Sequence, residues 1–287
     1  MAITAAMKLG TGLDHLAEQF PDRVLDTGIT EEHAATMAAG LAAGGMRPYV
    51  AVYSTFFQRC YDQMIHDVCM QRLPVVFLLD RSGIGGEDGQ THHGVFDFAE
   101  AIPAPGMTVL APCDALELQA MLRWTLTQDG PVVIRYAKSG KPLSDRTGIP
   151  ETFTPGRWNR IREGKDLALL AAGSMVERAL KVQALLREHG KEAAVWNCSG
   201  IKPLDEETLA SLGSCPFFTL EEHMVTGGFG AYVTEICSAR GMALPADCIG
   251  VPDRFVQHGE HEKLMDEIGL SPEKICARIL RKLGEAS

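Results

Sequence analysis

The chain has 287 residues, enough for two ordinary domains, and a formal net charge of −10 at pH 7. An acidic chain of this kind is a poor partner for nucleic acid, because neutralising phosphates requires clustered lysine and arginine. No apolar run approaches the length of a membrane span, and the first residues lack the features of a signal peptide, so we expect a cytoplasmic protein that does not bind membranes. The eight cysteines occur without a CxxC pair, which predicts reduced thiols and neither a zinc site nor a disulfide framework.

Short apolar runs alternate with helix-like segments through the first half of the chain. The expected strands are residues 2–7, 24–26, 47–54, 74–80, 107–111 and 131–136. The expected helices are residues 13–20, 31–43, 56–70, a short one near Phe96, and 115–127. The near-continuous apolar run at 74–80 is typical of a parallel sheet that is covered on both faces. The alternation therefore predicts an α/β domain at residues 1–145.

The second half repeats this alternation after a break in the pattern. Residues 137–164 are rich in Gly, Pro, Ser, Thr and charged residues, and we place a linker at 146–165. Expected strands then fall at 167–172, 193–197, 217–221 and 247–251. Expected helices fall at 176–189, 206–212, 228–240, 260–268 and 272–283. The predicted fold class is therefore α/β, with two parallel-sheet-type α/β domains, the second at residues 166–287.

Two adjacent glutamates, Glu31 and Glu32, stand where the helix at 31–43 should begin. Acidic residues in a first turn commonly stabilise a helix through its dipole, and this explanation accounts for both side chains. The alternative is that one of the two carboxylates points into a pocket and binds a ligand. The stretch alone favours the first explanation and leaves the second open.

Residues that follow the strands of the first half should meet at one rim, because ligands bind beyond the carboxyl ends of strands in an open parallel sheet. They include an acid, aromatic rings, histidines and several arginines, and arginine suits an anionic group such as phosphate. Each also has a structural explanation, as an ion-pair partner, a core residue or an ordinary loop residue. The loop GIGGEDG matches no phosphate-binding motif and no metal-ligand spacing occurs nearby, so the rim predicts a small anionic ligand and no metal. The rim residues are Glu31, His33, Tyr53, Phe56, Arg59, Arg81, Asp88, His92, His93 and Arg135.

Longer motifs cover nearly the whole chain in order. They include FPDRVLDTGITEEHAATMAAGLA, VAVYSTFFQRCYDQMIHDV, LPVVFLLDRSGIGGEDGQTHHGVFD and VPDRFVQHGE. With these motifs the chain resembles the C-terminal half of the 1-deoxy-D-xylulose-5-phosphate synthase family, which belongs to the transketolase superfamily of thiamine-diphosphate enzymes. The resemblance implies a pyrimidine-binding domain followed by a transketolase C-terminal domain, without the family's pyrophosphate-binding domain.

The resemblance also implies roles for single residues. Glu31 matches the glutamate that bonds N1′ of the cofactor's aminopyrimidine ring, where a carboxyl promotes proton transfer, and Glu32 then remains a helix-start acid. The implied reaction is decarboxylation of pyruvate and ligation of the two-carbon unit to glyceraldehyde 3-phosphate, whose phosphate Arg81 and Arg135 would hold. The implied set is Glu31 and His92 for catalysis; Glu31, Phe56 and Arg59 for the cofactor; and Tyr53, Arg81, Asp88, His92 and Arg135 for the substrate.

The sequence departs from the family pattern at three points. The family's YPRG is YAKS here, so the second arginine is either replaced by Lys138 or lost, and the loop carries Glu87 within GGEDG. The diphosphate–Mg²⁺ motif, GDG followed by an asparagine, does not occur. The resemblance therefore implies a separate partner subunit that supplies the pyrophosphate-binding domain and the Mg²⁺ ligands, in a homodimer or a heterotetramer. Three other interpretations remain open: a split transketolase, a 2-oxo acid dehydrogenase β-type subunit, and a non-catalytic interaction subunit.

Overall fold

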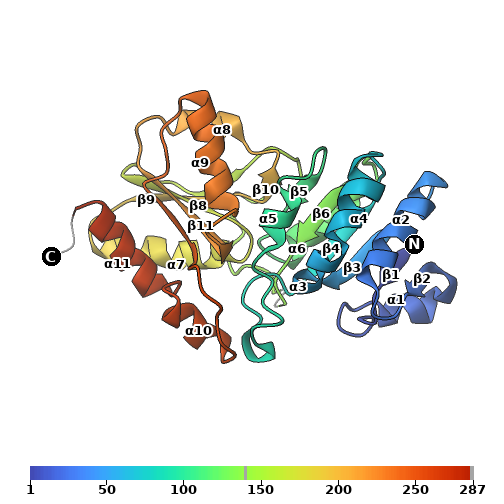
Figure 1. The fold of residues 1–287 in the computed structure, drawn as a ribbon. Helices are drawn as coiled ribbons and strands as arrows, with labels where there is room; N and C mark the ends of the chain where they lie inside the picture. Colours follow the sequence, from blue (N-terminus) through green and yellow to red (C-terminus); the bar gives the residue numbers. More distant parts are fainter. Residues whose placement is uncertain (139–140, 285–287) are drawn as a thin grey trace.

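The computed structural model describes residues 1–138 and 141–284, which form two α/β domains lying side by side (Figure 1). The first domain is built on a seven-stranded sheet and the second on a five-stranded sheet. Most strands of both sheets pair in parallel. The predicted fold class, two α/β domains of the parallel-sheet type, is therefore confirmed.

The first sheet has the strand order β10-β5-β6-β4-β3-β1-β2. Its neighbours pair in parallel, except that β10 runs antiparallel to β5. Parallel pairing brings the carboxyl ends of β2, β3, β4 and β6 to one edge of the sheet, so residues that follow these strands can share a site. The strands are β1 (Ala2–Thr4), β2 (Val24–Asp26), β3 (Tyr49–Tyr53), β4 (Val76–Asp80), β5 (Thr108–Leu110), β6 (Val132–Arg135) and β10 (Gly200–Lys202).

Helices cover both faces of the first sheet. On one face Phe77 belongs to the same apolar cluster as the buried alanines of α2 (Glu31–Ala43). On the other face Val76 clusters with Met121 of α6 (Ala115–Thr125). Successive side chains of a strand point to opposite faces, so a continuous apolar run supplies both layers. The domain also contains α1 (Asp14–Gln19), α3 (Ser54–Phe57), α4 (Tyr61–Gln63) and α5 (Asp97–Ala101).

The segment after β3 is irregular where the sequence predicts one helix over 56–70. The structure has α3, a 3₁₀ turn at Gln58–Cys60, α4, and a π-helical turn at Met64–Cys69. The apolar spacing continues throughout, but it does not report how the backbone hydrogen bonds are spaced. π-Helical turns inside helices are frequent at functional sites.

The second sheet has the strand order β12-β11-β8-β9-β7, and β7 runs antiparallel to β9. One face packs on α7 and α11, and the other on α9. The strands are β7 (Asn159–Arg162), β8 (Leu167–Ala171), β9 (Ala193–Asn197), β11 (Phe217–Met224) and β12 (Asp247–Val251). The helices are α7 (Met175–Glu188), α8 (Glu206–Ser211), α9 (Phe229–Arg240), α10 (His261–Glu267) and α11 (Pro272–Lys282).

Two short strands differ from the sequence expectations. β7 lies within the stretch 146–165, where the sequence predicts a linker, and it forms an edge of the second sheet. β10, which the sequence analysis does not predict, comes from the second half of the chain and joins the first sheet. Both are edge strands of three or four residues, too short to give a clear apolar alternation.

The two domains are locked together by more than β10. A single apolar cluster contains residues of both, from Phe57 in the first domain to Phe229 in the second. Lys202 reaches across and donates from Nζ to the carbonyl oxygens of Ile102 at 2.6 Å and Ala104 at 2.7 Å. Burial lowers the pKa of Lys202. The relation between the domains is therefore fixed by packing and by hydrogen bonds between them.

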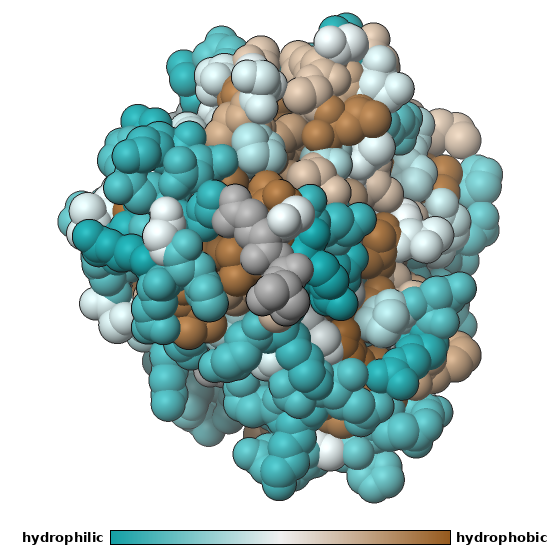
Figure 2. Space-filling model, turned by 90° about the vertical axis from the view of Figure 1, so that its left-hand side faces the viewer, coloured by the Kyte–Doolittle hydropathy of each residue, from teal (hydrophilic) through white to brown (hydrophobic). Residues whose placement is uncertain are grey.

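The end of the molecule formed by the second domain has a mostly hydrophilic lower half, while apolar residues gather in its upper part (Figure 2). None of the helices in the described part of the chain combines the length and the apolarity needed to cross a membrane.

Replacing Lys202 by Met should lower the free energy of unfolding by about 1–3 kcal/mol, because the carbonyl oxygens of Ile102 and Ala104 would lose a charged donor. Urea unfolding followed by circular dichroism measures the change. The control is Lys165→Met, because Lys165 is 75% exposed and pairs only at the surface with Glu192; its effect should stay within about 0.5 kcal/mol. Equal stability of the two variants would show that the Lys202 bridge does not hold the domains together.

Candidate cofactor and substrate site

Glu31 begins α2 and points into the protein. The chain leaves β2 at Asp26, whose Oδ1 accepts from the backbone N–H groups of Ala6 at 2.8 Å and Gly28 at 3.0 Å. Gly28 has a φ of +72°, which favours glycine, and it turns the chain towards the helix. The Glu31 side chain is only 2% exposed, whereas Glu32 is exposed. The turn therefore selects which of the two acids faces inward.

The Glu31 carboxylate is not fully satisfied by the described residues. Its Oε2 is buried and accepts no hydrogen bond from them. Arg59 Nε lies 3.0 Å from this oxygen, close enough for an ion pair but without the alignment of a hydrogen bond. A buried acceptor without a donor is costly unless a ligand or partner supplies one. Glu31 thus has an oxygen that can accept a hydrogen bond from a ligand.

Three rings form an aromatic cluster next to this segment. Phe56 in α3 stacks on Tyr53 with centroids 6.1 Å apart and an angle of 20° between the planes. His92 meets Phe56 edge-on at 5.4 Å and lies 6.5 Å from Tyr53. A Cβ atom at Gly10 would lie 1.7 Å from the Tyr53 hydroxyl oxygen, so a larger residue there would require the Tyr53 ring to move. Burial raises the pKa of Tyr53, and its hydroxyl stays protonated near neutrality.

A charged cluster adjoins the rings. The Arg81 guanidinium lies 3.9 Å from the centroid of the Tyr53 ring. Asp88 Oδ2 accepts from Arg81 Nη1 at 2.9 Å and lies 3.6 Å from Lys138 Nζ. The Arg81 Nε is buried without a hydrogen-bond acceptor among the described residues. The Asp80 carboxylate also interacts with both cations. A guanidinium and an ammonium group at one place are nevertheless groups that bind a small anion through charge-assisted hydrogen bonds.

Arg81 also carries backbone strain. Its φ is +60°, a conformation that residues other than glycine rarely adopt. The carboxylate of Asp80 holds this turn by accepting from the Arg81 backbone N–H at 2.7 Å. Strained residues persist only where the surroundings determine them, and they are concentrated at functional sites.

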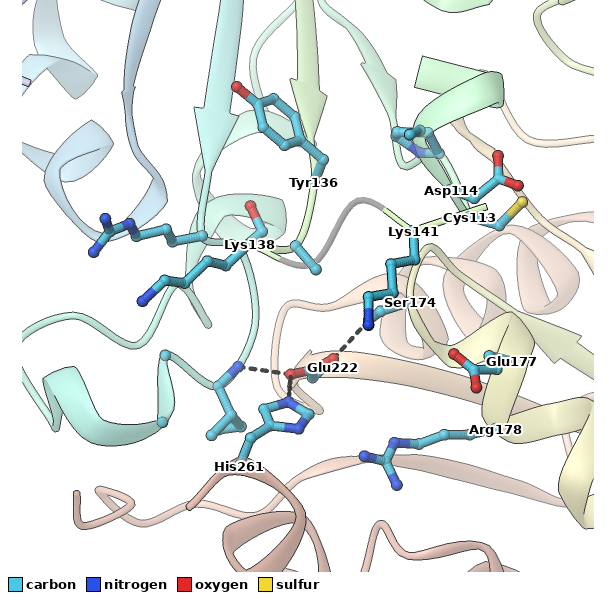
Figure 3. A pocket seen from close by; sticks show the side chains of 18 of the residues that line it. Cys113, Asp114, Tyr136, Lys138, Lys141, Ser174, Glu177, Arg178, Glu222 and His261 are labelled. Carbon is cyan, nitrogen blue, oxygen red and sulfur yellow. Dashed lines mark hydrogen bonds and ion pairs between the residues drawn. The ribbon is translucent and has the colours of Figure 1, made fainter. Parts of the chain in front are cut away.

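Arg81 and Lys138 line one side of a cleft of about 600 Å³ between the two domains. Figure 3 shows Lys138 on one side of the cleft and Glu177 and Arg178 of α7 on the other. Burial raises the pKa of Cys113, which also lines the cleft, so its thiol is not a nucleophile at neutral pH.

Arg135 is not at the rim, where the sequence analysis expects it. It is 4% exposed, and its guanidinium donates to Asp97 Oδ2 at 2.9 Å and to the carbonyl oxygen of Glu222 at 3.1 Å. It also stacks on the Phe98 ring at 4.4 Å. These partners occupy the guanidinium below the site surface, so Arg135 is not available to a substrate phosphate. The cation that stands beside Arg81 in space is instead Lys138.

Asp97 is the centre of this buried arrangement. Burial alone would raise its pKa, but the charges of Arg135 and His223 and the hydrogen bond from Ser54 hold the pKa of Asp97 below its ordinary value. Ser54 and Ser82 both donate to its Oδ2, at 2.7 and 2.8 Å. The pair between Arg135 and Asp97 therefore connects α3, the loop after β4, α5 and β6.

Of the remaining rim residues, Arg59 lies at the site, whereas His33 and His93 do not. Arg59 lies three positions after Phe56 and so links the aromatic cluster to Glu31. His33 is exposed on α2. His93 is buried, accepts from the Gly85 backbone N–H at 2.8 Å through Nδ1, and reaches carbonyl oxygens of the second domain through Nε2. His33 and His93 are therefore not part of the cluster.

Comparisons with known proteins show the family of the chain. Residues 1–142 match the family model described as transketolase, pyrimidine binding domain, and residues 156–275 match transketolase, C-terminal domain. The chain belongs to the transketolase superfamily. The resemblance drawn from the sequence motifs is thereby confirmed.

Curated relatives are named 1-deoxy-D-xylulose-5-phosphate synthase. The one from Pelotomaculum thermopropionicum is 46% identical over 290 residues, which cover 99% of this chain and 45% of that protein. The one from Gloeobacter violaceus is 47% identical over 289 residues, covering 99% of this chain and 45% of that protein. The chain thus spans less than half the length of the curated relatives it matches.

Solved structures share the fold. A chain titled "Split gene transketolase, inactive beta4 tetramer" is 29% identical with a TM-score of 0.86, and the match covers 100% of this chain and 92% of that one. A transketolase from Campylobacter jejuni is similar in fold, with a TM-score of 0.80 at 19% identity, over 98% of this chain and 43% of that one.

Replacing Arg135 by Met should lower the free energy of unfolding by about 3–5 kcal/mol, because Asp97 would be left charged and buried without its partner. Lys138→Met is the control, since Lys138 is 62% exposed, and its effect should stay within about 0.5 kcal/mol. Urea unfolding measures both.

The pH dependence gives a second check on this pair. Because the folded pKa of Asp97 is lowered, its contribution is present above about pH 3.9, the ordinary value, and is lost as the pH falls through the folded pKa. The difference between wild type and Arg135→Met should shrink in strong acid. An Arg135→Met variant as stable as wild type at neutral pH would contradict the structural role.

Proposed function

We propose that this chain is a subunit of a thiamine-diphosphate-dependent transferase of the 1-deoxy-D-xylulose-5-phosphate synthase type. The reaction would join the two-carbon unit of pyruvate to glyceraldehyde 3-phosphate with release of CO₂. The observation that carries the proposal is Glu31, a 2% exposed carboxylate whose Oε2 lacks a hydrogen-bond donor, in a chain that is 46% identical to a synthase of that name.

The residues present fit thiamine diphosphate at the pyrimidine end. The free Oε2 of Glu31 can accept from a protonated ring nitrogen, and Phe56 offers a half-buried ring on which a flat heterocycle can stack. Arg59 holds the Glu31 side chain through its ion pair. The bound cofactor would supply a carbon centre that adds to the keto group of pyruvate and accepts the electron pair of the C–C bond when CO₂ leaves. Glu31 would hold a proton at the ring nitrogen and so support this chemistry.

The charged cluster fits the phosphorylated aldehyde. Arg81 and Lys138 would bind its phosphate, with Asp88 fixing both cations in the absence of substrate. Tyr53 contacts both Arg81 of this cluster and Phe56, and His92 contacts the rings of Tyr53 and Phe56. Their polar atoms could therefore contact substrate oxygens between the phosphate and the cofactor, and His92 could exchange a proton there. Arg135 takes no part, for the structural reason given above.

A pyrophosphate-binding domain would come from a separate chain. This proposal is supported by the similarity to a split gene transketolase, a chain of nearly the same extent. The partner would bind the diphosphate and the Mg²⁺ ion, and the complex would be a cytoplasmic homodimer of such pairs, that is, a heterotetramer. The same similarity supports a second candidate, a split transketolase, which acts on ketose phosphates in place of pyruvate.

Reconstitution tests the function. Mixing this chain with a chain that carries the pyrophosphate domain should produce thiamine-diphosphate-dependent consumption of pyruvate and release of CO₂ in the presence of glyceraldehyde 3-phosphate. Activity with ketose phosphates and none with pyruvate would favour the split transketolase. A folded, associated and inactive pair would refute both.

Glu31→Gln should lower the rate of the reconstituted enzyme by about 10²- to 10⁴-fold, because the amide cannot hold the proton at the cofactor ring. Glu32→Gln is the matched control: the same chemical change one residue later, on an exposed side chain, should leave the rate within about twofold. Steady-state CO₂ release measures both. Equal losses in the two variants would show that Glu31 has no special role.

Lys138→Met should raise the KM for glyceraldehyde 3-phosphate by about tenfold, because one charge-assisted contact to phosphate is lost. The reaction with unphosphorylated glyceraldehyde should be unaffected, and Lys138→Arg should keep the low KM. An equal effect on both aldehydes would place Lys138 outside the phosphate site.

A further inference from the structure

Three consecutive polar residues, Glu221, Glu222 and His223, are buried in β11. Glu221 accepts from the first backbone N–H groups of α9, at Phe229 and Gly230, at 2.6 and 2.9 Å. His223 Nδ1 lies 2.7 Å from the carbonyl oxygen of Met224, so Nδ1 carries the proton and Nε2 accepts. Each of the three side chains thus has a separate partner, and the polar residues of this strand hold neighbouring elements in place.

Glu222 faces the cleft between the domains and is bonded on both oxygens. Oε1 accepts from the backbone N–H of Ile84 at 2.8 Å and pairs with His261 Nε2 at 3.1 Å, and Oε2 accepts from Ser174 Oγ at 2.6 Å (Figure 3). These partners come from the loop after β4, from the start of α10 and from the start of α7. Burial alone would raise the pKa of Glu222, but the hydrogen bond and charge of His261 keep it lowered. The carboxylate is therefore charged and fully occupied.

The loop is seated directly on this carboxylate. A side chain at Gly83, whose φ is +94°, would lie 2.6 Å from the Glu222 carboxyl carbon. Gly83 and Gly94 close the base of the loop by exchanging backbone hydrogen bonds of 2.7 and 2.8 Å. The segment between them carries Asp88 and His92, and Arg81 lies two positions before Gly83. Glu222 therefore contacts the base of the loop that carries the anion-binding side chains.

The second domain also contacts the same loop at His93, near its base, and at Gly86, near its tip. His93 Nε2 lies 3.1 Å from the carbonyl oxygen of Val256, and Gly259 donates its backbone N–H to the carbonyl oxygen of Gly86 at 3.3 Å. His261 follows Gly259 by two residues, so the loop tip and the Glu222 contact share one support. The loop is thus supported by the second domain at its base and near its tip.

We propose that Glu222, with His261 as its charged partner, is a positioning residue that fixes the loop 81–94 and its anion-binding side chains from the second domain. The inference deepens the proposed function, on which it rests for the identity of the substrate. The loop geometry itself belongs to this chain and can be tested without a partner.

Charged groups face His261 from each element around it. Glu222 approaches from β11, Glu262 lies next in α10 at 3.2 Å from Nδ1, and Arg178 from α7 pairs with Glu262 at 2.7 Å. The hydrogen bond to Glu222 raises the pKa of His261 above its ordinary value. The contact with Glu222 therefore favours the protonated form of His261, and protonation of His261 in turn strengthens that contact. Its contribution is complete below about pH 6.5 and is lost as the pH rises through the raised pKa.

Hydrogen exchange on the full chain tests the proposal. Glu222→Gln should reduce the protection of the Ile84 amide by about tenfold, because a neutral amide is a weaker acceptor and cannot serve all three donors. Ser174→Ala and His261→Gln should each reduce it several-fold. Amides of β8 should be unchanged in all three variants, which excludes general unfolding as the cause.

Glu260→Gln is the matched control, since it makes the same chemical change next to His261 on a carboxylate that, within residues 1–138 and 141–284, forms an ion pair with Lys263 and with no other residue. Its Ile84 protection should equal that of wild type. Unchanged Ile84 protection in Glu222→Gln with β8 intact would overturn the proposal, as would an equal loss in Glu260→Gln.

A pH series separates positioning from simple packing. The Ile84 protection factor in wild type should fall several-fold between about pH 6 and pH 9 as His261 loses its proton. The same series should be flat in His261→Gln. Glu221 also titrates in this range, because burial raises its pKa to about 8. Its carboxyl group faces the start of α9, so its titration is the same in wild type and in His261→Gln and does not account for a difference between them. A pH step that persists in His261→Gln would exclude His261 as the partner.

In the reconstituted enzyme, Glu222→Gln should raise the KM for glyceraldehyde 3-phosphate more than it lowers kcat. A change in kcat alone would contradict positioning of the anion site. Inactivity of the reconstituted wild type would refute the proposed function, while the hydrogen-exchange results on the single chain would still decide the positioning role.

Discussion

The buried ion pair between Arg135 and Asp97 fixes the parts of the molecule on which the candidate site depends. Arg135 ends β6 and Asp97 begins α5, and the same guanidinium reaches the carbonyl oxygen of Glu222 in the second domain. Removing either side chain would leave the other charge buried without a partner, at a cost of about 3–5 kcal/mol. The loop that carries Arg81 lies among them. Its position is therefore a consequence of the contact between the domains.

Buried polar groups divide into those that are satisfied and those that are not. Asp97, Glu221 and Glu222 accept two or more hydrogen bonds each and hold loops and helix ends in place. Glu31 Oε2 and Arg81 Nε are buried and have no hydrogen-bond partner among the described residues, although Arg59 Nε lies 3.0 Å from Glu31 Oε2 as an ion-pair partner. Other buried atoms of the described residues, such as Trp196 Nε1 and Thr219 Oγ1, also lack a hydrogen bond. What distinguishes Glu31 and Arg81 is that the unsatisfied atom belongs to a charged group beside the aromatic cluster, where an unsatisfied buried atom calls for an explanation.

Much of the fold and part of the site could be predicted from the sequence. Apolar runs such as 74–80 located the main strands, because a strand buried on both faces must be apolar at nearly every position. Family motifs singled out Glu31 and the loop around Asp88. The prediction for Arg135 was wrong, because a residue at a strand end can point to the rim or into the domain contact. Lys138 was noticed only as a departure from the motif, and its approach to Asp88 depends on how the chain turns after β6.

The sequence by itself determined the α/β class, the superfamily and the acid at the start of α2, because period, turn residues and motifs are local properties of the chain. It did not determine which cation stands beside Arg81, or that β10 joins the first sheet. Three polar residues within an apolar strand, at 221–223, were a visible signal in the sequence, but they did not reveal that Glu222 supports the loop. Those features depend on contacts between residues far apart in the chain. Only tertiary packing decides them, since burial and hydrogen-bond partners are set by what the rest of the chain brings near.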